Sequence, residues 1–241
     1  MNMYPQGSGM RKPFELEYAT DNRAVTSFFN VVYAWMAVGI ALTAAVGWMV
    51  SQNTEIMKVV YGSRAGYLIF GLAAFGIAMF VQTQATKISA NVSTVLFLAY
   101  AGILGMLLSG IFIIYPSKTL FSAFLLTGGV FGGMSVYGFV TKRDLSRMGS
   151  ILIMCFWGLF LASIVNLFVA SGAMSWLITY GILAVFIGIT AYQTQMLKEV
   201  AQQVAGDQVM APRMAIFGAL VLYIAFINIF LSILRILGDR K

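Results

Sequence analysis

Apolar residues occur along this chain in long uninterrupted stretches, and polar residues collect in the short segments between them. A stretch of about 20 nearly uncharged residues, folded as a helix, crosses the roughly 30 Å hydrocarbon core of a bilayer. Apolar and polar positions do not alternate within the stretches, which argues against a transmembrane β-barrel. The pattern predicts an all-α integral membrane protein, a bundle of seven transmembrane helices at 29–50, 65–86, 93–115, 119–140, 149–170, 175–197 and 213–237.

The composition agrees with a chain that lies in lipid. Apolar residues make up 60% of it and charged residues 10%, and the mean hydropathy is +0.88, which is outside the range of soluble domains. The connections are too short to hold a soluble domain, so residues 29–238 are expected to form one transmembrane domain. Residues 1–28 lack the apolar core of a cleavable signal and are expected to form a mobile cytoplasmic tail.

Lys and Arg residues predict the orientation, because positively charged loops stay on the cytoplasmic side of a membrane. With the amino terminus inside, the inner segments hold nine of them, and the outer connections hold Lys58, Arg64 and Lys118. The three basic residues at the carboxy terminus leave two interpretations open: the last segment crosses fully, or it bends back to the cytoplasm. The net charge of +7 is scattered over short loops, which is not typical of a nucleic-acid-binding face.

The residue types that are missing exclude most catalytic and metal chemistry. The chain has no histidine, so histidine-based triads and metal sites are excluded, and it has no phosphate-binding glycine motif. The single cysteine, Cys155, is expected to pack as a small apolar residue. All eight carboxylates fall in tails or loops, so the spans lack the acids that line proton relays and many cation pathways. We expect no enzymatic activity and no cofactor.

Four glycines in the fourth span form two overlapping G-x-x-x-G patterns: Gly128, Gly129, Gly132 and Gly133. Such patterns let another helix approach closely. Packing within the chain is the favoured interpretation, because a seven-helix bundle has many internal seams, and dimerisation is the alternative.

Polar residues in the last two spans predict a polar stripe on one face of the last helix. Ala225, Asn228, Ser232 and Arg235 are spaced three, four and three residues apart, so they share one helical face. A polar stripe on a membrane helix is expected to turn toward protein or water, although Asn228 and Ser232 are also residues that join helices, and Arg235 is placed to reach the membrane interface. If Gln193 and Gln195 faced this stripe, they would form a neutral polar cluster.

Three segments resemble a known family: "SVYGFVTKRDLSRMGSIL" at 135–152, "TAYQTQMLK" at 190–198 and "LYIAFINIFLSILRILG" at 222–238. Together they are similar to the bacterial branch of the Bax inhibitor-1 family, also called the transmembrane Bax inhibitor motif family. The resemblance implies a seven-helix fold whose last helix is central and wrapped by the other six. It also implies a pH-sensitive calcium leak, suppression of cell death in animals and plants, and modulation of a membrane protease in some bacteria.

The family's pH switch is attributed to two aspartates, and this chain has neither. The resemblance places Gln193 and Ala225 at those positions. A close aspartate pair titrates with a raised apparent pKa, whereas neither of these residues titrates, so the pH response is expected to be weakened or lost. Other pore or polar-cluster candidates are Tyr192, Gln195, Asn228, Ser232 and Arg235.

Two functions follow as alternatives for a protein of the bacterial inner membrane. One is a calcium leak channel with an altered switch, for which calcium is the transported ion. The other is a non-conducting regulator that binds a membrane protease or another membrane protein. A regulator would contact its partner through residues 1–28 or through the loops "TKRDLSRMG" and "KEVAQQVAGDQVMAPR", although such loops more often serve only as solvated connections that set topology.

Overall fold

The computed structural model describes residues 13–238, apart from the side chains of residues 13–22 and 64–65. The described residues form helices and short connections, without a strand. Seven spans are long and apolar enough to cross a membrane, which confirms the predicted all-α membrane bundle. They are Arg23–Ser51, Gly66–Gln84, Ala90–Ile114, Ser117–Val140, Ser146–Val169, Gly172–Gln203 and Met210–Leu237.

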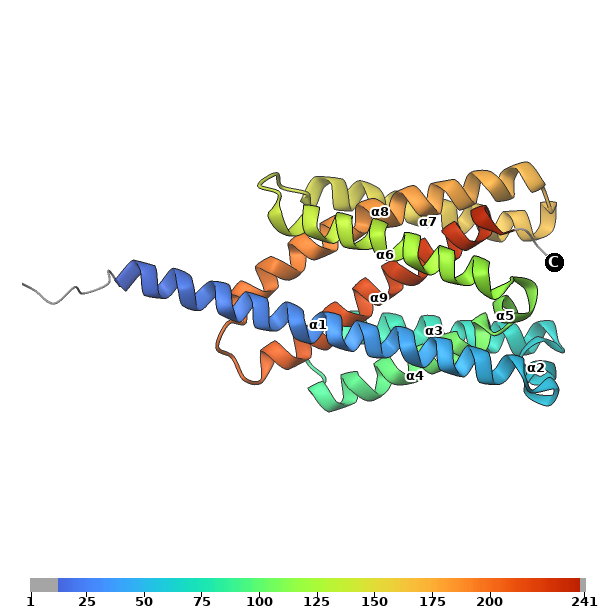
Figure 1. Ribbon diagram of the computed structural model, residues 1–241, viewed down its shortest axis with the longest axis horizontal. Coiled ribbons are helices and arrows are strands. Elements are labelled where there is room, and N and C mark those ends of the chain that lie inside the picture. The colour runs from blue at the N-terminus through green and yellow to red at the C-terminus, as the bar shows by residue number, and fades with distance from the viewer. Residues whose placement is uncertain (1–12, 239–241) are drawn as a thin grey trace, which may run out of the picture.

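The described residues form nine helices (Figure 1), of which all but α2 belong to a span: α1 (Pro13–Ser51), α2 (Thr54–Tyr61), α3 (Arg64–Gln84), α4 (Ala90–Leu108), α5 (Gly110–Ile114), α6 (Ser117–Val140), α7 (Ser146–Val169), α8 (Gly172–Gln203) and α9 (Met210–Leu237). The third span consists of α4 and α5 together. We call the end of the bundle where α1 begins and α8 turns into α9 the inner end, and the opposite end the outer end.

The first helix starts earlier than the sequence predicts. Residues 13–28 are helical and do not form a tail, while residues 1–12 lie outside the described part. A proline at the first helical position is favoured because its fixed φ suits a helix. Val25 and Phe28 belong to the hydrophobic core, and the ring of Phe29 packs edge-to-face on Phe139 of α6 with 5.2 Å between centroids. Burial of this apolar face favours helix in a segment whose charges suggested a tail.

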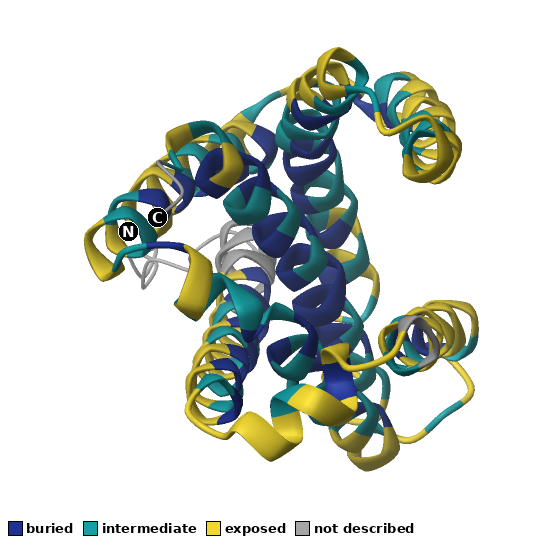
Figure 2. Cartoon of the chain, turned by 90° about the vertical axis from the view of Figure 1, so that its right-hand side faces the viewer, coloured by how far each residue is buried: buried dark blue, intermediate teal, exposed yellow. Residues whose placement is uncertain are grey.

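The last helix is the most buried of the seven spans. Within its most apolar stretch 72% of the residues are buried, against 33% or less in each of the others. It packs against α1, α3, α4, α6 and α8, and Figure 2 shows the buried residues gathered in the middle of the bundle. Burial on this scale explains why α9 is apolar around almost its whole circumference.

The fifth span, α7, departs from the predicted ring of six helices around the last one. It packs chiefly on α8, and none of the residues in its most apolar stretch is buried. Cys155 is exposed on this helix and does not pack inside the protein. The apolar surface of α7 therefore faces lipid. An exposed side chain such as Phe168 is stable there because the lipid tails are as apolar as a protein core.

The carboxy-terminal helix runs without a break from the inner end of the bundle to the outer end. The guanidinium of Arg235 donates a hydrogen bond to Ser175 Oγ, in the first turn of α8. Gly238 lies against the ring of Tyr115, which precedes α6. Both contacts are at the outer end, opposite the α8–α9 turn (Figure 1). The interpretation in which this segment bends back to the inner end is therefore wrong, because its 28 residues are long enough, at about 1.5 Å per residue, to traverse the bilayer.

The four glycines of the predicted packing motif do not approach any helix. A Cβ added at Gly128, Gly129, Gly132 or Gly133 would meet nothing within 4 Å, so the favoured interpretation of packing within the chain is wrong for the described residues. The close approach on α6 occurs instead at Gly138, where a Cβ would lie 2.2 Å from the carbonyl oxygen of Ala191 on α8. Which glycine allows close helix packing depends on where a neighbouring helix lies, and not on the G-x-x-x-G spacing.

Candidate functional site on α8 and α9

Gln193 and Ala225 lie on two helices that pack against one another. Ala225 is fully buried on α9, and Gln193 is half-buried on α8. The Gln193 Oε1 atom is buried and has no hydrogen-bond partner among the described residues. A buried acceptor without a donor costs about 1–3 kcal/mol. Position 193 therefore holds a neutral polar group at a place where the surrounding helices offer it no bond.

Gln195 holds the connection between α6 and α7. Its Oε1 atom accepts a hydrogen bond of 2.8 Å from the Leu145 amide, and its Nε2 atom donates one of 2.8 Å to the Arg143 carbonyl. Two otherwise unpaired backbone groups are thereby satisfied at the inner end. Gln195 is a positioning residue for the loop and does not belong to a polar cluster with α9.

Asn228 and Ser232 also bond away from the predicted cluster. Asn228 Nδ2 donates to the Ile224 carbonyl, and Ser232 Oγ donates to the Asn228 carbonyl, both at 2.8 Å and both within α9. Because α8 and α9 run antiparallel, these residues lie nearer the outer end than Gln195 does. The cluster that the sequence suggested is therefore not formed. The two side chains donate instead to backbone carbonyls of their own helix, α9.

Tyr192 packs on the neighbouring helix α7. A Cβ at Gly149 would lie 2.5 Å from Tyr192 Cδ2, so this aromatic ring occupies the space that the glycine leaves. Tyr192 is thus a packing residue between α7 and α8 in this conformation.

A chain of hydroxyl groups joins α1, α6 and α8, and the sequence analysis missed it. Tyr33 Oη lies 2.7 Å from Ser135 Oγ, which lies 3.0 Å from Thr194 Oγ1. Thr194 donates its single proton to the Thr190 carbonyl at 2.8 Å. Ser135 must therefore donate to Thr194, and Tyr33 must donate to Ser135. The close approach at Gly138, one turn from Ser135, brings α6 near enough to α8 for this contact.

A second hydroxyl pair joins α1 to α9. Tyr223 is fully buried, and its hydroxyl lies 2.6 Å from Thr43 Oγ1. Thr43 also lies within bonding distance of the carbonyls of Gly39 and Ala101, at 2.9 and 3.0 Å. Because both carbonyls only accept, the Tyr223 hydroxyl donates to Thr43. Phe97 packs edge-to-face on the Tyr223 ring. This part of the core is neutral and closely packed.

Charged groups of the described residues lie at the ends of the bundle. The Lys198 ammonium donates to the Phe139 carbonyl at 3.0 Å and sits 4.9 Å from the centre of that ring. Described carboxylates do not gather into a cluster of three that could hold a metal ion. A hydrogen bond from Ser146 lowers the pKa of Asp144, and hydrogen bonds from the Met210 and Val209 amides lower the pKa of Asp207. Both groups are therefore ionised at neutral pH.

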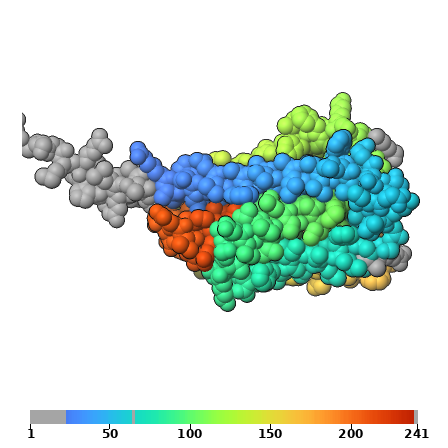
Figure 3. Space-filling view, turned by 90° about the horizontal axis from the view of Figure 1, so that it is seen from below, coloured from blue at the N-terminus to red at the C-terminus, as the bar shows by residue number. Residues whose placement is uncertain are grey.

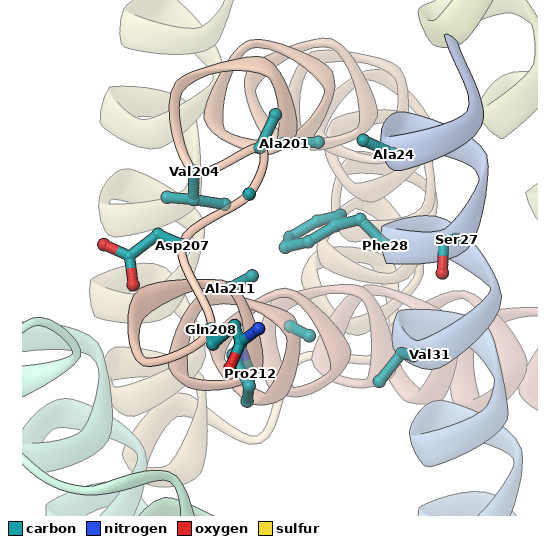
Figure 4. A pocket seen from close by; sticks show the side chains of 13 residues that line it. Ala24, Ser27, Phe28, Val31, Ala201, Val204, Asp207, Gln208, Ala211 and Pro212 are labelled. Atoms are coloured by element: carbon teal, nitrogen blue, oxygen red, sulfur yellow. The ribbon is translucent and has the colours of Figure 1, made fainter. Parts of the chain in front are cut away.

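The inner end also has an apolar cavity of about 530 Å³. Its walls come from the first part of α1 and from the α8–α9 turn, which lie beside each other in the space-filling view (Figure 3). The ring of Phe28 points into it from α1, across from Val204, and the Asp207 carboxylate lies at its edge (Figure 4). The cavity therefore brings together parts of two segments that the sequence analysis named as partner-binding candidates.

Comparison with known proteins agrees with this arrangement. A sequence model of the family described as "Inhibitor of apoptosis-promoting Bax1" matches residues 25–241. The chain belongs to the Bax inhibitor-1 family. The inner membrane protein YbhL of Escherichia coli K12 is 37% identical over the full length of both chains. An uncharacterized protein of Deinococcus radiodurans is 41% identical over 90% of this chain and 92% of its own.

Membership of the Bax inhibitor-1 family, together with the seven spans, identifies the chain as a multi-pass protein of the inner membrane. Seven of its described basic residues lie at the inner end and four at the outer end, which favours a cytoplasmic inner end. Hydropathy and motif length made the family recognisable from the sequence. The Tyr33–Ser135–Thr194 chain was hidden because a hydroxyl residue in a span carries no signal of which helix it faces.

Proposed function

We propose that this Bax inhibitor-1 family member is a calcium leak protein whose flux does not respond to pH, because Gln193 and Ala225 replace the titrating acid pair of its relatives. One observation carries the proposal: the side chain at position 193 is a neutral amide with a buried, unpaired oxygen. Its partner position holds a fully buried methyl group. Neither gains or loses a proton between about pH 6 and pH 8, the interval in which a raised carboxylate pair would titrate.

In the described conformation, α9 has no open path for ions around Ala225, which supports a leak that conducts only slowly. Ala225, Leu222 and Ile229 show no exposed surface, so α9 presents packed apolar groups and not a hydrated face. No carboxylate among the described residues lies within the packed part of the spans, which removes the usual electrostatic attraction for a divalent cation. We expect a slow flux of calcium that is constant with pH.

Calcium efflux from vesicles tests this proposal directly. The purified native chain and a Gln193→Asp/Ala225→Asp variant are reconstituted at equal density and assayed from about pH 6 to pH 8, which brackets the titration of a raised pair. The native chain is expected to give a low, flat profile, and the variant a profile that changes with pH. An Asn228→Asp variant is the matched control, since it adds one acid to α9 without a partner. A native flux that varies with pH would contradict the proposal.

The second candidate is a non-conducting regulator that binds another membrane protein, such as a membrane protease. The apolar cavity between α1 and the α8–α9 turn favours it, because it offers a concave, mostly apolar site at the inner end. Absence of flux in both the native chain and the double variant would support this candidate. A photo-crosslinking residue at Val204, used in native membranes, would then capture the partner, and the same residue at lipid-facing Phe168 would serve as the control.

A further inference from the structure

A cavity at the outer end has the Arg235–Ser175 hydrogen bond in its wall and contains neither Gln193 nor Ala225. It has a volume of about 210 Å³ and is lined by Ser163, Asn166 and Leu167 of α7, Ser175 and Ile178 of α8, and Arg235 of α9. One water needs about 10–15 Å³ of such space, so the cavity has room for a larger polar group. Three helices and one cation thus surround a space that the calcium proposal does not use.

The polar atoms of the cavity are mostly hydrogen-bond donors. The Asn166 Oδ1 atom already accepts a bond of 3.1 Å from the Ser171 amide, which leaves its NH₂ group to donate. Ser175 Oγ accepts from Arg235, so its own proton remains to be donated. The guanidinium has five N–H donors in all and uses one here. Ser163 Oγ already donates to the Leu159 carbonyl, so the vacant donors are those of Arg235, Asn166 and Ser175, and they suit an acceptor-only ligand, which is an oxyanion.

The charge of Arg235 is not balanced by the described part of the protein. The carboxylates described are Glu55, Asp144, Glu199 and Asp207. Glu55 pairs with Lys58 at 2.8 Å, and the other three belong to the inner end. Asp239, the acid nearest to Arg235 in sequence, lies outside the described residues. A bound anion would supply the missing negative charge, and Arg binds phosphate strongly because its planar fork matches two oxygens.

The depth of the cavity indicates where such an anion comes from. Trp176 follows Ser175, and its ring stacks on Tyr180 with 5.9 Å between centroids. Both rings are about half exposed, at 47% and 53%. Exposed Trp and Tyr mark the level of the lipid headgroups in membrane proteins. The cavity therefore lies where the phosphate of an outer-leaflet phospholipid is the most abundant oxyanion.

We propose that the cavity formed by Arg235, Asn166 and Ser175 binds a phosphate oxyanion, supplied by the headgroup of a phospholipid in the outer leaflet. The guanidinium and the Asn166 amide hold the phosphate oxygens, and the Ser175 hydroxyl adds a third donor. The lipid fills the outer junction of α7, α8 and α9. The site lies at the opposite end of the bundle from Gln195 and works whether or not the protein conducts calcium.

Ligand titrations of the delipidated full-length protein in detergent test this site. The probes are short-chain phosphatidylglycerol, a phosphate-free glycolipid with the same acyl chains, and inorganic phosphate, with binding followed by native mass spectrometry. We expect saturable binding of phosphatidylglycerol, at least tenfold weaker binding of the glycolipid, and little competition by inorganic phosphate. Equal binding of both lipids would overturn the phosphate assignment. Full competition by inorganic phosphate at similar concentrations would overturn the lipid source.

Variants locate the binding at this cavity. Arg235→Gln and Asn166→Asp should each weaken binding of phosphatidylglycerol at least tenfold, the second because it places a negative charge among the donors while Arg235 is kept. Arg235→Lys should retain part of the affinity, since it keeps the charge and loses the fork. Lys118→Gln is the matched control, because it removes another outer-end cation. A loss with Lys118→Gln equal to that with Arg235→Gln, or unchanged binding by Asn166→Asp, would refute the site.

Discussion

Replacement of Gly138 by alanine tests the contact between α6 and α8 on which the hydroxyl chain depends. The added Cβ would lie 2.2 Å from the Ala191 carbonyl oxygen and 2.9 Å from the carbonyl carbon. Ordinary contacts of this kind begin at 3.4 Å, so the two backbones must separate by about 1 Å to relieve the overlap. Such a shift would carry the Ser135–Thr194 distance of 3.0 Å beyond hydrogen-bond range.

The loss of stability in Gly138→Ala has two contributions, the steric overlap and the lost Ser135–Thr194 hydrogen bond. Overpacking of a well-packed site costs typically about 1–3 kcal/mol, and a hydrogen bond between membrane helices contributes about 0.6 kcal/mol. The variant is therefore expected to be destabilised by about 2–4 kcal/mol, which for a chain of this size lowers the unfolding midpoint by about 4–16 °C. Thermal unfolding in detergent, followed by loss of the monodisperse peak in size-exclusion chromatography, measures the shift.

Gly133→Ala on the same helix is the matched control for this experiment. A Cβ at Gly133 meets nothing within 4 Å, and alanine is a better helix former than glycine by up to about 1 kcal/mol. Its midpoint should stay the same or rise slightly. If Gly138→Ala were as stable as Gly133→Ala, the backbone contact between α6 and α8 would be refuted, and with it the explanation for the position of Ser135.

Three further predictions concern other contacts. Tyr33→Phe removes the first donor of the hydroxyl chain and should lower stability by about 0.5–1.5 kcal/mol, measured in the same unfolding assay against Tyr137→Phe, whose ring is exposed. Gln195→Ala leaves the Leu145 amide unpaired and should speed its hydrogen exchange, whereas unchanged exchange would contradict the role of Gln195. The lowered pKa of Asp207 contributes stability at a pH above its ordinary value of 3.8, and that stability is lost as the pH falls through the folded-state pKa. Asp207→Asn should therefore be less sensitive to acid, with both proteins flat from pH 6 to pH 8.

The sequence predicted the spans well because the cost of burying charge in lipid acts on every residue of a span. It failed at the start of α1, which begins at Pro13, ahead of the apolar stretch, and whose residues Val25 and Phe28 pack into the core. The polar contacts were less predictable. Gln195 and Asn228 bond to backbone groups chosen by helix rotation and by local loops, and neither is encoded in residue spacing. For the same reason the sequence did not indicate Gly138 as a packing residue and wrongly indicated Gly128, since a glycine allows close packing only where another helix lies against it.

The hydroxyl chain from Tyr33 to Thr194 also determines how this region treats a proton. Each of its hydrogens is already committed in one direction, and the last one points at the Thr190 carbonyl, which has no hydrogen to release onward. Repeated proton transfer along the chain would require each hydroxyl to turn and break its present hydrogen bond. The three helices α1, α6 and α8 are therefore held together by hydrogen bonds that all point one way and end at a backbone carbonyl, so the bundle gains cohesion from polar groups that are already saturated.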